Sequence, residues 1–235
     1  MAPVAILAGG LATRLYPTTK NMPKSMLVVA GKPFISHQLE LLQTKGITEV
    51  VICAGYLGEQ IQDFVLDGKD FGLEVKYSFD GVKQLGTGGA IKRALSKLKD
   101  PFFVMYGDSY LDIDYKGIAN YFISNKMPGL MTVLKNENKW DKSNLIFENN
   151  QIVKYDKNDI TPDMNYIDYG LGIFRKSVFD NYSKDEMFDL ASVYMKLAEK
   201  QCLLGYEVKN RFYEIGSHIG LEETEKYIIN RNNLK

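Results

Sequence analysis

The stretch PVAILAGGLATR, residues 3–14, decides the fold. Its apolar first half is typical of a buried strand, and Gly9 and Gly10 predict a tight loop directly after that strand. Because glycine has no Cβ, the backbone N–H groups of such a loop can approach phosphate oxygens closely. Arg14 and Lys24 follow and supply a guanidinium fork and an ammonium charge, which suit a triphosphate. The sequence therefore predicts an α/β fold that opens with a strand and a phosphate-binding loop.

Strand-like runs alternate with helical patterns through the first half, as in βαβ units around a mostly parallel sheet. We expect strands at 3–8, 49–54, 73–79 and 101–107, with helices at 33–46 and 87–100. The second half predicts strands at 129–135, 143–148, 151–156, 166–174 and 203–208, with helices at 189–200 and 220–231. Turn-rich segments between these strands favour an antiparallel or mixed extension of the sheet. No repeat or linker divides residues 1–235, so we expect one domain.

The composition excludes several classes of protein. Lys plus Arg and Asp plus Glu are both 29, so the formal net charge is zero and gives no broad footprint for nucleic acid or anionic lipid. The apolar start lacks the basic region of a signal peptide, and no run approaches the roughly 18 apolar residues of a membrane span. Cys53 and Cys202 lie apart in apolar contexts, as free thiols in a reducing compartment would. We expect a cytoplasmic protein that binds neither nucleic acid nor membranes.

The other common phosphate loops fail on spacing. The chain has no GxxxxGK[ST] motif, and neither AGGLATR nor GTGGAIK satisfies GxGxxG. The alternative for residues 7–14 is a plain glycine turn beside a surface arginine and lysine. The second glycine-rich segment, residues 84–89, either forms another backbone cradle or, through Gly88 and Gly89, only allows close packing of a helix.

Three segments resemble one enzyme family. LAGGLATRLYPTTKNMPKSM (7–26), LGTGGAIKRAL (85–95) and YGDSYLDID (106–114) are similar to motifs of the sugar-phosphate nucleotidylyltransferases, in particular of the heptose-1-phosphate and mannose-1-phosphate guanylyltransferase branches. The resemblance implies a Rossmann-like three-layer α/β/α sandwich, with a nucleotide-binding half (1–110) and a sugar-phosphate-binding half (111–235). It also implies a Mg²⁺-dependent, in-line attack by a sugar 1-phosphate on the α-phosphate of a nucleoside triphosphate, with release of pyrophosphate.

The resemblance assigns roles position by position. Arg14, Lys24 and Asp108 would be catalytic, and Lys157 would bind the sugar phosphate. Apart from the resemblance, Asn144 and Asp168 lie on predicted strands of the second half, and their side chains could bind sugar hydroxyls, although Asp168 at a strand edge could equally be structural. Gly170 completes the sugar-phosphate set. The nucleotide-binding set is Leu7, Ala8, Gly9, Gly10, Thr13, Arg14, Lys24, Asp80, Gln84, Gly86 and Thr87. Ala12 stands where the family usually has glycine. Asp80 favours GTP, because a carboxylate accepts hydrogen bonds from the two adjacent donors of guanine.

Asp108 is the first candidate ligand for Mg²⁺. It directly follows a predicted strand, and ligands of open α/β sheets bind at the carboxyl ends of the strands. Magnesium is commonly held by one or two carboxylates together with phosphate oxygens. Glu214, at a position where the family usually has aspartate, is the second candidate. Asp112 and Asp114 compete, although their spacing also fits a solvated strand edge or a helix cap.

Two other functions stay open at this point. One is a related enzyme with another acceptor, such as a polyol phosphate or phosphocholine. The other is a binding module that keeps the nucleotide loop without the chemistry. Covalent acyl chemistry is disfavoured, because the chain has no GxSxG motif and its only histidines, His37 and His218, have no catalytic partner in any motif. The identity of the sugar and the oligomeric state, with a homodimer as one alternative, are also open.

Overall fold

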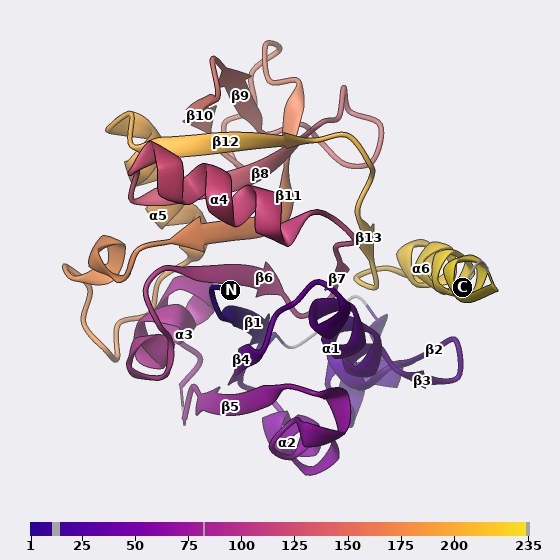
Figure 1. The fold of residues 1–235 in the computed structure, drawn as a ribbon. Helices are drawn as coiled ribbons and strands as arrows, with labels where there is room; N and C mark the ends of the chain where they lie inside the picture. The colour runs from indigo at the N-terminus through magenta and orange to yellow at the C-terminus, as the bar shows by residue number, and fades with distance from the viewer. Residues whose placement is uncertain (11–14, 82, 234–235) are drawn as a thin grey trace.

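The computed structural model describes residues 1–10, 15–81 and 83–233. Within these residues a nine-stranded sheet has the order β5-β4-β1-β6-β11-β8-β12-β10-β9 (Figure 1). Its strands are β1 (Val4–Ala8), β4 (Glu49–Ala54), β5 (Glu74–Phe79), β6 (Phe102–Tyr106), β8 (Gly129–Lys135), β9 (Leu145–Glu148), β10 (Gln151–Tyr155), β11 (Tyr166–Phe174) and β12 (Leu203–Val208). Strands β10 and β11 run against the others, so the sheet is mixed but mostly parallel.

Helices cover both faces of this sheet, which gives three layers (Figure 1). The helices are α1 (Phe34–Thr44), α2 (Gly58–Val65), α3 (Gly86–Ala94), α4 (Tyr115–Asn125), α5 (Leu190–Glu199) and α6 (His218–Asn233). One core lies under α1, α2 and α4, and a second lies under α3 and α5. The Rossmann-like α/β/α fold is thereby confirmed. None of the described helices has the length and apolar character needed to cross a membrane.

Successive side chains of β1 point to opposite faces of the sheet and so contribute to both cores. Val4 and Ile6 belong to the core under α1, whereas Ala5 belongs to the core under α3. Helices cover both faces of β1, so a continuous apolar run is required. Because β1 pairs in parallel with both β4 and β6, its carboxyl end lies between the carboxyl ends of those two strands.

Two short ladders and several 3₁₀ turns complete the described structure. Strand β2 (Val28–Val29) pairs with β3 (Lys32–Pro33), and β7 (Ser109–Tyr110) pairs with β13 (Tyr213–Glu214). The 3₁₀ turns are Thr18–Lys20, Lys24–Met26, Lys69–Phe71, Leu95–Lys97 and Lys176–Phe179.

The sequence located most strands but misjudged some local features. The expected strands 49–54, 129–135, 166–174 and 203–208 coincide with β4, β8, β11 and β12. Helices α2 and α4 were not predicted, and the helix expected at 87–100 gives way to a 3₁₀ turn after Ala94. Asn144 lies just before β9 rather than on a strand, and Asp168 lies in β11, inside the sheet rather than at its edge.

Candidate active site

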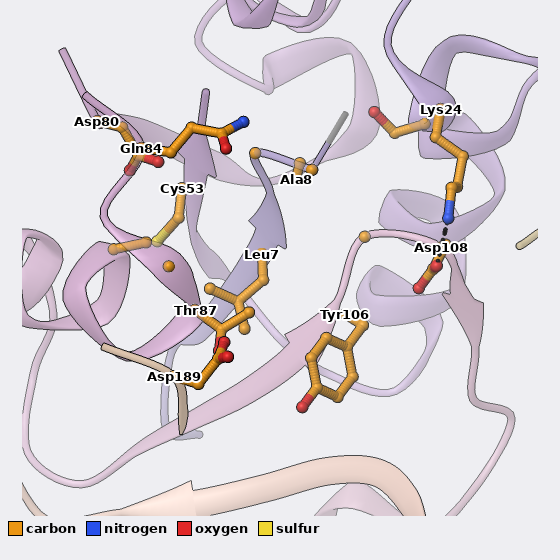
Figure 2. A pocket seen from close by; sticks show the side chains of 16 residues that line it. Leu7, Ala8, Lys24, Cys53, Asp80, Gln84, Thr87, Tyr106, Asp108 and Asp189 are labelled. Carbon is orange, nitrogen blue, oxygen red and sulfur yellow. Dashed lines mark hydrogen bonds and ion pairs between the residues drawn. The ribbon is translucent and has the colours of Figure 1, made fainter. Parts of the chain in front are cut away.

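A cavity of about 330 Å³ opens at the carboxyl end of β1, between α3 and the segment after β6 (Figure 2). Most of the residues expected to bind nucleotide line it. These are Leu7, Ala8, Gly9, Gly10, Lys24, Asp80, Gln84, Gly86 and Thr87, and the catalytic candidate Asp108 lines it with them. Thr13 and Arg14 lie outside the described residues. The predicted nucleotide set thus gathers round one cavity although it comes from four separate segments.

The glycine loop is fixed by close backbone contacts. A Cβ on Gly9 would lie 3.3 Å from the nitrogen of Gly55 and 3.5 Å from the Asp80 carboxylate. The N–H of Gly107 donates to the carbonyl oxygen of Leu7 at 2.9 Å, which holds the end of β1 against the segment after β6. No described residue beyond its chain neighbours comes within 4 Å of the Cβ position of Gly10. With respect to the described residues, the loop is therefore anchored at Gly9 and open at Gly10.

The second glycine segment has a different role at two of its positions. The N–H groups of Gly88 and Gly89 donate to the carbonyl oxygen of Phe188, at 2.9 and 3.2 Å. A Cβ at Gly88 would overlap the Phe188 ring, and one at Gly89 would overlap the Glu186 carbonyl. These two glycines allow close packing, and their amides are already used. Gln84, Gly86 and Thr87 are what this segment contributes to the cavity.

Lys24 and Asp108 form an ion pair in the cavity wall (Figure 2). The Lys24 Nζ lies 2.8 Å from an Asp108 carboxylate oxygen, and the two side chains are 22% and 31% exposed. Lys24 begins a 3₁₀ turn, whereas Asp108 follows β6. Because both side chains keep contact with solvent, a ligand that brings phosphate and metal charges can separate them.

Asp108 and Glu214 are neighbours although they are far apart in the sequence. Glu214 pairs with Ser109 in the β7–β13 ladder, and the N–H of Ile215 donates to the Asp108 carbonyl oxygen at 2.9 Å. The Glu214 carboxylate accepts hydrogen bonds from the N–H of Gly216 and, at 3.2 Å, from the Ser217 hydroxyl. It therefore faces the start of α6 rather than the cavity.

The donor chemistry fits Mg²⁺ with help from a substrate. The described residues contain no group of three or more His, Cys, Asp or Glu side chains that would hold a metal by themselves. Asp108 offers a carboxylate in the wall of the cavity that the glycine loop also lines. Magnesium usually keeps waters and binds one or two carboxylates plus phosphate oxygens, so Asp108 together with a bound phosphate would fit this cation.

The competing acidic residues have structural partners. Asp112 forms ion pairs with Lys45 at 2.5 Å and with Arg231 at 2.7 Å. The Asp114 carboxylate accepts the N–H of Gly117 at 2.9 Å and caps α4, as the helix-cap alternative predicted. Neither residue lines the cavity.

Replacing Asp112 tests whether this residue is structural rather than a metal ligand. Because its side chain is only 19% exposed, Asp112→Asn is expected to cost about 1–3 kcal/mol of unfolding free energy. Its activity at 25 °C and its Mg²⁺ dependence are expected to stay within about twofold of the starting protein. Urea unfolding and a Mg²⁺ titration of the rate measure the two quantities. A large loss of Mg²⁺ affinity would indicate that Asp112 is a Mg²⁺ ligand.

Asp80 lies at the opposite end of the cavity from Asp108. It is buried, and the N–H of Leu85 lies 3.4 Å from its carboxylate. Arg93 donates to the carbonyl oxygen of Asp80 at 2.5 Å, which fixes the backbone there. Burial raises the pKa of the Asp80 carboxyl, and the Leu85 hydrogen bond and the Arg93 charge offset part of that effect.

The four sugar-phosphate candidates gather beside β11. The Asp168 carboxylate accepts the N–H of Gly170 at 2.9 Å, and the Asn144 side-chain oxygen lies 3.4 Å from the N–H of Asp168. Burial raises the pKa of Asp168, and the nearby positive charge of Lys157 lowers it. Gly170 has φ +99°, and a Cβ there would lie 3.7 Å from the Tyr106 ring. The group therefore adjoins the cavity through Tyr106.

Six described residues that line the cavity were not among the predicted site residues: Ser25, Cys53, Ala90, Tyr106, Gly107 and Asp189. Among them, Tyr106 and Asp189 carry polar side-chain groups suited to a sugar or nucleotide (Figure 2). Tyr106 stands just before Gly107 and Asp108, so its place at the end of a strand was a usable signal. Asp189 had no local signal. Its partner in the cavity wall is Thr87, about one hundred residues earlier, at 2.9 Å.

Comparison with known proteins identifies the family of this chain. The nucleotidyl transferase family matches residues 4–227. The chain belongs to this family. A D-glycero-alpha-D-manno-heptose 1-phosphate guanylyltransferase of Campylobacter jejuni is 30% identical over 204 residues, 84% of this chain and 89% of that protein. An N-acetylmuramate alpha-1-phosphate uridylyltransferase of Neisseria meningitidis is 30% identical over 94% of this chain and 95% of its own length.

Other relatives show how far the likeness extends. The chain is 28% identical to a mannose-1-phosphate guanylyltransferase catalytic subunit beta of Drosophila melanogaster and spans 58% of that protein's length. The structure of HddC from Yersinia pseudotuberculosis, complexed with GMP-PN, has a TM-score of 0.80 and 24% identity. That match covers 97% of this chain and all of the other, and it shows that the two share a fold.

Proposed function

We propose that the protein is a sugar-1-phosphate nucleotidylyltransferase that joins a nucleoside triphosphate, preferably GTP, to a heptose or hexose 1-phosphate and releases pyrophosphate. The observation that carries the proposal is the Lys24–Asp108 pair, 2.8 Å apart, in the wall of a cavity that also contains the open face of the glycine loop. The guanylyltransferase relatives support the same reaction class.

The chemistry needs alignment and charge neutralisation rather than a strong base. The sugar phosphate already carries an oxyanion, which attacks the α-phosphorus while pyrophosphate leaves on the opposite side. In this proposal the amides of the glycine loop orient the triphosphate, and Lys24 neutralises the reacting phosphates as their charge develops. Lys24 would become available for this role when the Asp108 carboxylate binds a metal cation instead of the Lys24 ammonium. Arg14, outside the described residues, is proposed to assist.

Bound Mg²⁺ would supply a Lewis acid that withdraws charge from the phosphate oxygens. We propose Asp108 as its main protein ligand. Glu214 is the second, and its longer side chain would reach the metal through a water or after leaving the Gly216 amide and the Ser217 hydroxyl. The division into a nucleotide half (1–110) and a sugar-phosphate half (111–235) and a cytoplasmic location are parts of the same proposal.

A substrate matrix tests the function. Pyrophosphate release is measured with GTP, ATP, CTP, UTP and dTTP against the 1-phosphates of heptose, mannose, glucose and N-acetylglucosamine. We expect one neutral heptose or hexose to give the highest kcat/KM, with GTP as the donor. Turnover with polyol phosphate or phosphocholine instead would support the alternative acceptor. Nucleotide binding without turnover of any acceptor would indicate a binding module.

The preference for GTP is expected to depend on Asp80 and on pH. Only the ionised carboxylate accepts both guanine donors, and burial raises the pKa of this group. The affinity for GTP should therefore fall on acidification at a higher pH than an exposed aspartate would cause. Asp80→Asn is expected to lower the kcat/KM ratio of GTP to ATP at least about tenfold and to remove this pH dependence. An unchanged ratio, or a preference of the starting protein for CTP or UTP, would refute the role of Asp80.

A further inference from the structure

The side chain of Asp189 is turned away from the helix that it begins. Asp189 is the N-cap residue of α5, where an aspartate usually accepts an N–H of its own helix. Here it makes no such bond. Instead the Thr87 hydroxyl donates to the Asp189 carboxylate at 2.9 Å and accepts the N–H of Leu190 at 2.8 Å. A threonine from α3 thus takes over the cap, and the carboxylate is held in the cavity wall (Figure 2).

This carboxylate lies in a wall that adjoins the sugar-phosphate candidates. Asp189 and Tyr106 both line the cavity, and the Tyr106 ring lies 3.7 Å from the Cβ position of Gly170, whose N–H donates to the Asp168 carboxylate at 2.9 Å. Asp108 is paired with Lys24, and Asp168 lies near Lys157. For Asp189 the described residues provide the Thr87 hydroxyl, a neutral donor, and no ion pair with a lysine or arginine.

We propose that Asp189, held by Thr87, binds ring hydroxyls of the sugar 1-phosphate and restricts the substrate to sugars without a carboxylate. This inference rests on the proposed function and refines it. A carboxylate has several acceptor sites, so with one used by Thr87 it can still accept bonds from two neighbouring hydroxyls. A sugar that carries its own carboxylate meets Asp189 and Asp168 at close range. Like charges in a partly desolvated site repel strongly, which lowers the affinity for such a sugar.

The test uses pairs of sugar 1-phosphates that differ by a carboxylate. Glucose is compared with glucuronic acid, mannose with mannuronic acid, and N-acetylglucosamine with N-acetylmuramic acid. The starting protein is expected to favour the neutral member of its best pair by at least about 100-fold in kcat/KM. Asp189→Asn keeps the shape but removes the charge. It should lower kcat/KM for the neutral sugar by about 10–100-fold, mainly through KM of the sugar, and shrink the neutral-to-acidic ratio at least tenfold.

Three controls separate positioning from general damage. Asp180→Asn removes an exposed charge outside the cavity. It should change neither the neutral-to-acidic ratio of kcat/KM nor KM of the sugar. KM for the nucleotide and the melting temperature of Asp189→Asn should stay near those of the starting protein. Thr87→Val should raise KM of the sugar. Because Thr87 also belongs to the proposed nucleotide set, the double variant is compared by KM of the sugar at saturating nucleotide. That KM should rise little more than in Asp189→Asn alone, because one change removes the charge and the other removes the hydroxyl that holds it.

The outcomes keep this inference apart from the proposed function. Turnover of neutral sugars, with an unchanged sugar KM and an unchanged selectivity ratio in Asp189→Asn, overturns the role of Asp189 and leaves the enzyme assignment intact. Faster turnover of a carboxylated sugar by the starting protein does the same. Turnover of no sugar 1-phosphate with any triphosphate overturns the proposed function itself.

Discussion

Asp108→Asn is expected to lower the rate of pyrophosphate release by at least about 1,000-fold at saturating substrate. The change removes a ligand oxygen and a negative charge from the proposed metal site, and it leaves the Lys24 ammonium without its partner at 2.8 Å. The loss should be partly recovered at high Mg²⁺ concentration, because weakened metal binding is its cause. Single-turnover kinetics across a Mg²⁺ titration measure both effects.

The neighbouring acidic residues provide the comparison. Glu214→Gln is expected to weaken Mg²⁺ about tenfold and to destabilise the start of α6, whereas Glu214→Asp should be partly tolerated. Asp114→Asn should keep full metal dependence, since that carboxylate caps α4. A nucleotide complex in which the cation is held by Asp112 or Asp114, with Asp108 uninvolved, would contradict the assignment.

Lys24→Ala is expected to lower kcat by at least about 100-fold with the fold intact. The ammonium faces charge that develops on the phosphates during transfer, so its loss affects the transition state more than the binding of the triphosphate. Because the Lys24–Asp108 pair is partly exposed, the variant's free energy of unfolding should fall by at most about 1 kcal/mol. Steady-state rates and urea unfolding test the two statements.

Lys20→Ala serves as the matched control. It removes the same charge from an exposed residue four positions earlier that does not line the cavity. Near-normal turnover is expected for this variant. The same result for Lys24→Ala would show that Lys24 is only a surface lysine beside a glycine turn, and the active site would have to be sought elsewhere.

The sequence predicts the elements whose signals are local and regular. The strands 49–54 and 203–208 are apolar runs of ordinary strand length, and their bounds match β4 and β12. Helix α2 was missed because it has eight residues and begins after Leu57, which has φ +55° and no side-chain cap. Helix α4 had a start signal in Asp114, but its aromatic and β-branched residues favour strands.

What the sequence does not predict is contact between distant segments. Strand β11 enters the sheet between β6 and β8, and only this order brings Asp168 next to Tyr106. The bond between Thr87 and Asp189 likewise joins helices α3 and α5. Periodicity and turn chemistry act over a few residues, so they cannot specify which strands become neighbours. The glycine loop could be read directly because Gly9 and Gly10 lie within one short segment.

The two-residue ladder between β7 and β13 determines when, during translation, the proposed active site becomes complete. Every described residue of the proposed nucleotide set precedes residue 90, yet the carbonyl of Asp108 is held by Ile215, which is made near the end of the chain. Domains generally fold as units, and the amides of Gly88 and Gly89 are held by Phe188, so the pocket and its proposed metal ligand are completed together, after the late residues have been made. An incomplete chain on the ribosome is thus expected to turn over no nucleoside triphosphate until residues 111–235 have folded against residues 1–110.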